Sequence, residues 1–280
     1  MAFRSNGPIT LALPAFRGVT RRIILTAVVV YFGQLVLGLF APKLQALLMD
    51  QLMLHPDELR RGAVWQLLSY PFMMDGFLSV LFAVLSVWFF GSVLEDERGS
   101  NWFREYFLVA TIGGGVLISL LAYAAGTHIP GLDPAQRASG LWPAVLAILL
   151  AYGRFHANEE IRLYFVLKIK AKYLVGIYVL FYIAIALIGG DRFGALTTLC
   201  NALCGFVYLS LAPRQGLRFA VSERWFRVRN SYYRARRLRA AKKFTVYMRK
   251  QGKDVNIDPS GRYIDPDGNP RDPNDRNWMN

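Results

Sequence analysis

The first residue in this sequence that could do chemistry is Ser139, which stands in a polar step, residues 137–140, before the apolar run 141–152. A serine hydroxyl becomes a nucleophile only when a neighbouring base removes its proton. The same hydroxyl could instead cap a helix, because its oxygen accepts hydrogen bonds from the amides of the first turn. The surrounding elements must decide between these two roles.

The composition is that of a membrane protein. Of the 280 residues, 54% are hydrophobic and only 19% are charged, which is too apolar for a soluble domain of this length. The formal net charge is +14, and about 17 Lys and Arg face about 7 Asp and Glu after residue 213. This uneven distribution predicts a basic tail that attracts anionic lipids. No nucleic-acid partner is expected.

Apolar segments follow one another along most of the chain. Each is long enough, or nearly so, to cross about 30 Å of hydrocarbon. The segments are residues 23–41, 77–94, 104–126, 139–154, 173–189 and 194–212. They predict an all-α polytopic membrane protein with an N-terminal segment 1–22, a six-helix domain 23–212 and a tail 213–280. We expect the tail to be helical to about residue 251 and turn-rich beyond it.

The basic residues also predict how the chain crosses the membrane. Lys and Arg gather in the N-terminal segment, in the connection 154–172 and in the tail. Because positively charged segments stay on the cytoplasmic side, both termini are expected inside and residues 42–76 and 127–138 outside. A multi-pass protein of a bacterial inner membrane is the expected setting.

The sequence predicts neither a metal nor a cofactor. Cys200 and Cys204 are four residues apart in an apolar run, where a helix places both on one face at membrane depth. No second ligand pair accompanies them, so they suggest neither a zinc site nor a disulfide framework. The alternating Asp265, Asp267 and Asn269 lack the glycine and glutamate that a calcium loop needs.

Several motifs together resemble the rhomboid family of intramembrane serine proteases. They are Trp65-Gln66-Leu67-Leu68-Ser69-Tyr70-Pro71-Phe72, Trp88-Phe89-Phe90-Gly91, Leu94-Glu95 with Gly99, Ala138-Ser139-Gly140, and Lys168-Ile169-Lys170-Ala171-Lys172-Tyr173. Their order agrees with the six predicted spans over about residues 22 to 212. The resemblance implies a six-helix bundle of the rhomboid type with a serine at the opening of the fourth span.

The resemblance also implies where the catalytic groups would lie. In rhomboids a histidine on the sixth span is the base, and a His and an Asn on the second span donate to the oxyanion. Matching the motifs places the base position at Thr198, with Gly205 fixing the register, and the oxyanion positions at Ser79 and Ala83. Ser139 then remains as a vestigial nucleophile position in a catalytically deficient member.

The three histidines offer little replacement for the base. His156 follows Ser139 by about 17 residues, some 25 Å along a helix, and is too distant. His55 lies in the first outer loop. His128 is on the outer side, and we expect it to be the only histidine able to approach the serine. Loss of the base alone removes a factor on the order of 10⁶ in serine hydrolases.

Structural roles are the simpler interpretation of the polar residues in the spans. Ser139 is expected to cap the fourth helix. Asn201 is costly at membrane depth unless it is paired. With Thr198 it could form a polar groove, or the two could hold neighbouring helices together by hydrogen bonds.

Three functions remain open from the sequence. The first is a rhomboid pseudoprotease, which binds transmembrane segments or membrane proteins without cleaving them. The second is an active intramembrane serine protease that uses Ser139 with a non-standard base. The third is a lipid-facing scaffold whose basic tail is the working part. The joint replacement of base and donors at Thr198, Ser79 and Ala83 favours the first.

Overall fold

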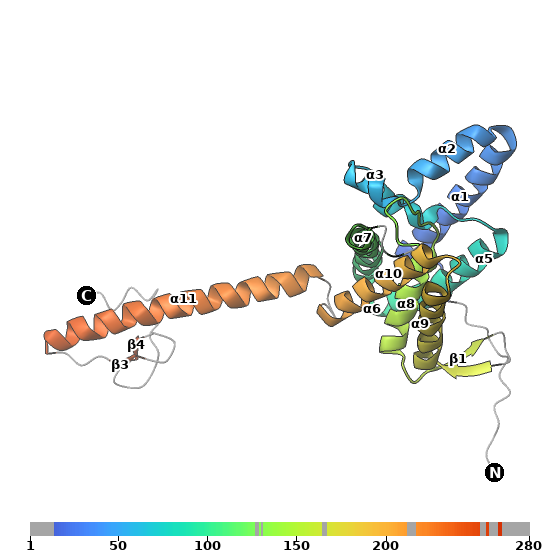
Figure 1. Ribbon diagram of the computed structural model, residues 1–280. Coiled ribbons are helices and arrows are strands. Elements are labelled where there is room, and N and C mark those ends of the chain that lie inside the picture. The colour runs from blue at the N-terminus through green and yellow to red at the C-terminus, as the bar shows by residue number, and fades with distance from the viewer. Residues whose placement is uncertain are drawn as a thin grey trace, which may run out of the picture. The chain divides into compact units, whose positions relative to one another are not determined.

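The chain forms two compact units, Met1–Leu217 and Arg218–Asn280. The computed structural model describes residues 14–126, 129, 131–163, 167–211, 217–252, 256–257 and 263–264. Helices dominate this part of the chain (Figure 1). Each unit is taken by itself below.

The first unit is a bundle of apolar helices. Five are long and apolar enough to cross a membrane: α1 (Gly18–Phe40), the helical stretch Phe77–Arg98, α7 (Ser100–Ala125), α9 (Ala171–Ile188) and α10 (Arg192–Leu211). A sixth, α8 (Trp142–Phe155), is apolar but shorter. These helices coincide closely with the six predicted segments, so the prediction of an all-α polytopic membrane protein is confirmed.

The second span is not a single regular helix. α5 (Phe77–Ser86) passes into the π-helical turn η2 (Val87–Gly91) and then into α6 (Ser92–Arg98). A Cβ at Gly91 would lie 3.0 Å from the Phe103 ring and 3.5 Å from the Thr20 side chain. The missing side chain therefore lets this turn lie close to the first and third spans.

Glu95 ties the second span to the start of the first. Its carboxylate accepts hydrogen bonds from the backbone N–H of Val19 at 2.7 Å and of Thr20 at 2.8 Å, and from the Thr20 hydroxyl at 2.7 Å. The carboxylate thus caps the N-terminus of α1, where the helix dipole favours an anion. Gly18 has a φ of +69°, and a Cβ there would lie 2.0 Å from this carboxylate, so only glycine fits.

The connection between the first two spans is a packed layer of short helices. It comprises α2 (Pro42–Leu52), α3 (Pro56–Arg60), α4 (Gln66–Ser69) and η1 (Tyr70–Phe72). Gln66 is fully buried within it. Its side-chain oxygen accepts from the His55 N–H at 2.9 Å, and its amide donates to the Gln51 carbonyl at 3.3 Å. These bonds fix the loop that leads to the second span.

A β-hairpin joins α8 to α9. Strand β1 (Glu160–Leu163) pairs antiparallel with β2 (Leu167–Lys170), and Glu160 lies opposite Lys170. The hairpin occupies the basic connection that the sequence places between the fourth and fifth spans.

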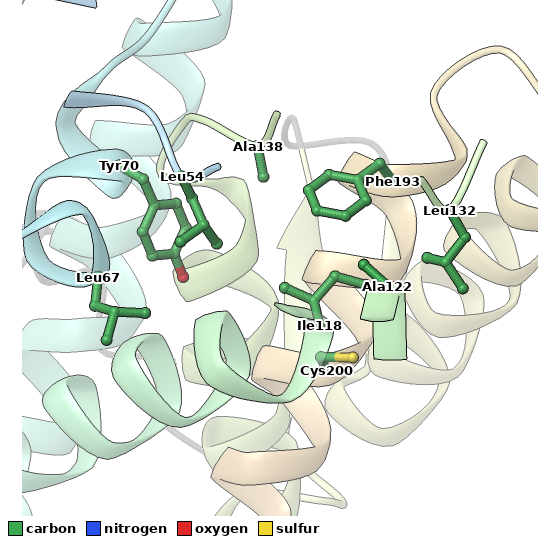
Figure 2. Packing of buried hydrophobic residues seen from close by; sticks show 9 residues of the cluster. All are labelled: Leu54, Leu67, Tyr70, Ile118, Ala122, Leu132, Ala138, Phe193 and Cys200. Atoms are coloured by element: carbon green, nitrogen blue, oxygen red, sulfur yellow. The ribbon is translucent and has the colours of Figure 1, made fainter. Parts of the chain in front are cut away.

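The core of the first unit lies where α7 meets α10, beneath the connection before the second span (Figure 2). One cluster consists of Leu54, Leu67, Tyr70, Ile118, Ala122, Leu132, Ala138, Phe193 and Cys200. The approach is closest at Gly114, where a Cβ would lie 2.6 Å from the Asn201 Cα. Small residues at such contacts let membrane helices pack backbone to backbone.

The second unit contains a long helix and a short strand pair. Helix α11 (Leu217–Lys250) has 34 residues. Strands β3 (Asn256–Ile257) and β4 (Tyr263–Ile264) pair antiparallel, with Ile257 opposite Tyr263.

Candidate functional site

The serine step is held by backbone bonds to distant parts of the chain. Leu54 and Ala138 form an isolated antiparallel bridge in which each N–H donates to the other's carbonyl at 3.0 Å. Gly140 follows with a φ of +97°, and its N–H donates to the Tyr70 carbonyl at 2.9 Å. Ser139, half-buried, therefore sits between an extended residue and a sharp turn.

This geometry corrects the predicted role of Ser139 as a helix cap. α8 begins only at Trp142, its N-cap is Leu141, and no side-chain hydrogen bond caps it within the described part of the chain. The physical reason is the bridge at Ala138 and the turn at Gly140, which keep the serine out of the first helical turn.

The predicted base position, Thr198, holds no base. Its side chain is buried in α10, and its hydroxyl donates to the Gly194 carbonyl of the same helix at 2.8 Å. An alcohol oxygen is far less basic than an imidazole, so it cannot take the serine proton at neutral pH. Thr198 therefore satisfies its polar group within its own helix and does not bond to Asn201.

The two predicted oxyanion positions lie one turn apart on α5. Ser79 accepts a hydrogen bond from the Trp142 indole N–H at 2.9 Å, which joins the start of α5 to the start of α8. Ala83 is completely buried and carries only a methyl group. At the two predicted positions the chain therefore carries a hydroxyl that accepts a hydrogen bond from Trp142 and an apolar side chain.

Asn201 is paired, but to a residue far away in the sequence. Its Nδ2 donates to the Tyr70 hydroxyl at 2.9 Å, and that hydroxyl donates to the Thr111 carbonyl at 3.1 Å. The Asn201 Oδ1 is buried without a hydrogen-bond partner among the described residues. It faces Gly114, where a Cβ would come within 1.7 Å of it.

Tyr70 is the site residue that sequence reasoning missed. Its carbonyl holds Gly140 and its hydroxyl binds Asn201, so it connects the serine step to the sixth span. Burial raises the pKa of Tyr70 above its ordinary value. The hydrogen bond from Asn201 offsets only part of this rise. The phenol therefore stays neutral and acts as a hydrogen-bonding strut. Its only signal in the sequence was its place inside the motif that precedes the second span.

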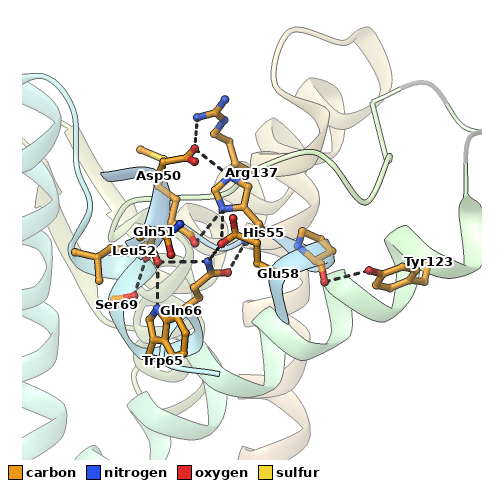
Figure 3. Close-up of polar contacts among 12 residues, drawn as sticks. Asp50, Gln51, Leu52, His55, Glu58, Trp65, Gln66, Ser69, Tyr123 and Arg137 are labelled. Atoms are coloured by element: carbon orange, nitrogen blue, oxygen red, sulfur yellow. Dashed lines mark hydrogen bonds and ion pairs between the residues drawn. The ribbon is translucent and has the colours of Figure 1, made fainter. Parts of the chain in front are cut away.

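One histidine lies beside the serine step, and it is not the expected one. The bridge between Leu54 and Ala138 brings His55 next to Arg137 (Figure 3). Asp50 lies between them, 3.6 Å from the His55 Nε2 and 3.1 Å from the Arg137 Nη1. The other ring nitrogen, Nδ1, lies 3.3 Å from the Met53 carbonyl. Both ring nitrogens therefore face groups other than the serine.

The remaining histidines do not supply a base within the described residues. His156 lies at the far end of α8, where its Nε2 is 2.7 Å from the Glu97 carboxylate. His128, which the sequence predicts to be the only histidine able to approach the serine, lies outside the residues that the structure describes. Among the described residues, the Ser139 hydroxyl makes no hydrogen bond to a histidine or a carboxylate.

Comparison with known proteins gives one family. The family model described as "Eukaryotic integral membrane protein (DUF1751)" matches residues 23–212, which cover α1 from Ile23 onward and the other five apolar helices entirely. No curated protein matches the chain. The description supports a multi-pass integral membrane protein. The family is described as eukaryotic, which conflicts with the bacterial inner membrane expected from the sequence.

Proposed function

Because the chain belongs to the DUF1751 family of eukaryotic integral membrane proteins, we propose that it is a rhomboid-like pseudoprotease that binds transmembrane segments or membrane proteins without cleaving them. The rhomboid-like motifs support this proposal, since they fall in the same stretch, 23–212, that the family covers. The motifs that shape the bundle are retained, while the catalytic positions are replaced.

The observation that carries the proposal is the hydrogen bond of Thr198. At the position of the base, its hydroxyl is buried and bonded to the backbone carbonyl of Gly194. Without a base, a serine alcohol attacks an amide too slowly to be useful, by a factor on the order of 10⁶. The methyl group of Ala83 removes an oxyanion donor as well.

Binding of membrane segments needs an apolar surface that the bundle leaves uncovered. α9 is the least covered span, with 11% of its most apolar stretch buried. Leu180 and Leu187 on it are 70% and 73% exposed, and Phe77 and Leu78 at the start of α5 are 61% and 64% exposed. In lipid such faces associate through close packing rather than through the hydrophobic effect. They are the surfaces on which we expect a partner helix.

A fluorophosphonate probe tests the loss of catalysis. We expect purified full-length protein to show no labelling above that of Ser139→Ala, while an active rhomboid in the same detergent is labelled. Efficient labelling that disappears in Ser139→Ala would overturn the proposal in favour of an active protease. In that case His55→Ala, which removes the histidine nearest the serine step among the described residues, would show whether His55 is the unusual base.

Site-specific crosslinking tests the binding. A photoreactive side chain at Leu78 or Leu180 should capture a membrane-spanning protein in intact membranes, because both positions are exposed on the uncovered faces. The matched control is Leu39, which is 81% exposed on α1. Capture of lipid alone at Leu78 and Leu180, or equal protein capture at Leu39, would contradict selective binding at these faces.

A further inference from the structure

An apolar groove separates the start of the first span from the second. Phe16, Ile24, Val84 and Trp88 line it, and its volume is about 350 Å³. The indole N–H of Trp88, its one polar group, donates to the Pro14 carbonyl at 3.2 Å. The volume is in the range of small-molecule pockets, and the lining offers only apolar contacts.

A cation lies against one of the rings that line this groove. The guanidinium of Arg21 lies 5.9 Å from the centroid of the Phe16 ring, and that ring packs edge-on against Trp88 at 6.1 Å. Arg21 is exposed and makes no ion pair with the described residues, whereas Arg17 is paired with Asp96 at 2.8 Å. The apolar lining of the groove therefore has a positive charge next to it, at Phe16.

One wall of the groove belongs to an irregular part of the second span. Trp88 belongs to the π-helical turn Val87–Gly91, and Val84 lies one turn before it. A π turn interrupts the regular rows of side chains on a helix, and such turns are frequent at functional sites. The π-helical turn and the charge at Arg21 are thus two separate features of the same groove.

We propose that this groove holds an acyl chain of an anionic phospholipid whose phosphate pairs with Arg21. Arginine near a helix end reaches toward the head groups, where it attracts anionic lipid, and an aromatic ring beside it suits the same interface. A partner helix is excluded by size, since a spanning helix is about 10 Å wide and 30 Å long and only its side chains could enter. The residues of this site belong neither to the basic tail nor to the serine step.

Native mass spectrometry of the purified full-length protein tests the site. Phosphatidylglycerol and phosphatidylcholine with identical acyl chains are added in turn, and retained lipid is counted. We expect phosphatidylglycerol to be retained more strongly. Val84→Phe, which fills the groove, should lose both lipids, while Arg21→Gln should weaken only phosphatidylglycerol, by about fivefold for one cation.

Matched variants control for nonspecific effects. Val29→Phe makes the same change at an exposed residue of α1, outside the groove lining, and Arg61→Gln removes an exposed cation elsewhere. Equal lipid retention in Val84→Phe and Val29→Phe would overturn the groove as the site. Equal loss in Arg21→Gln and Arg61→Gln would overturn the pairing with the head group. Displacement of the lipid by free glycerol phosphate would overturn the role of the acyl chain in the groove.

A second measurement does not depend on Val84→Phe. Brominated phosphatidylglycerol should quench the fluorescence of Trp88, obtained as the difference between the wild type and Trp88→Phe. Brominated phosphatidylcholine should quench it less. Equal quenching by the two lipids, or none, would contradict the proposal even if Val84→Phe failed to fold.

Discussion

At Tyr70 one side chain serves two buried polar partners, the amide of Asn201 and the carbonyl of Thr111. Tyr70→Phe keeps the ring but leaves both partners without this hydroxyl. Unsatisfied buried polar groups cost about 1–3 kcal/mol, so we expect a lower melting temperature in detergent. Tyr173→Phe, at an exposed position of α9, is the control. Identical melting of the two variants would contradict the strut role of Tyr70.

Glu95 offers a second test at a single residue. Glu95→Gln removes the charge that accepts three hydrogen bonds at the start of α1. Bonds to a charged group contribute about 1.5–3 kcal/mol, so a clear loss of thermal stability is expected. Its neighbour is the matched control, because Asp96→Asn breaks only the exposed pair with Arg17. An exposed pair contributes about 1 kcal/mol or less. If both variants melted alike, the capping role would be wrong.

The site residues could be located from the sequence, but their partners could not. Motif matching identified Ser79, Thr198 and Asn201 as the positions to inspect, since it needs only residue order. The partner of Asn201, Tyr70, is 131 residues away, and no pattern in the sequence around Asn201 indicates the pairing. Ser139 was assigned a cap because serine before an apolar run usually is one, and the bond between Ala138 and Leu54 overrides that local preference.

Among the elements, the pair α7 and α10 depends on one glycine. At Gly114 a Cβ would lie 2.6 Å from the Asn201 Cα, whereas at Gly113 the nearest atom is the Cys204 Sγ at 3.2 Å. Gly114→Ala should therefore force the helices apart at a cost of about 1–3 kcal/mol. Gly113→Ala should cost less, since a side chain can move.

The two alanine variants are compared by thermal melting in one detergent. Gly176→Ala on α9 is the control for helix propensity, because nothing lies within 4 Å of its Cβ position and alanine favours the helix. Gly176→Ala should melt at or above the wild type. Equal effects at Gly113 and Gly114 would mean that the close approach does not limit stability.

The elements themselves were largely predictable from hydropathy. A run of apolar side chains sets a span through local chain length and composition, so α1, α7, α9 and α10 begin and end near the predicted residues. The π turn Val87–Gly91 and the β1–β2 hairpin were not predicted. Both arise from contacts beyond the segment, such as that of Gly91 with Phe103, which hydropathy does not contain.

For the whole molecule, the two compact units predict separable stability. A protein that ends at Leu217 lacks the second unit, Arg218–Asn280, and keeps every apolar helix of the first. We expect its melting temperature in detergent to match that of the full chain. A large drop would mean that the second unit stabilises the membrane bundle.

The same truncation separates two of the functions left open by the sequence. A pseudoprotease that binds through α5 and α9 should still crosslink its partner from Leu78 or Leu180 without residues 218–280. A scaffold that works through its basic tail should lose the partner. Loss of capture in an otherwise stable truncated protein would therefore favour the scaffold.

The cap that Glu95 places on α1 also constrains how the protein is made. Val19 and Glu95 are 76 residues apart, so the first span leaves the ribosome well before its cap exists. During that interval the amides at the start of α1 depend on water or lipid head groups. The start of α1 can form its final hydrogen bonds only after the second span has been synthesised and packs beside it. The order of synthesis thus places the capping of the first span after the synthesis of the second.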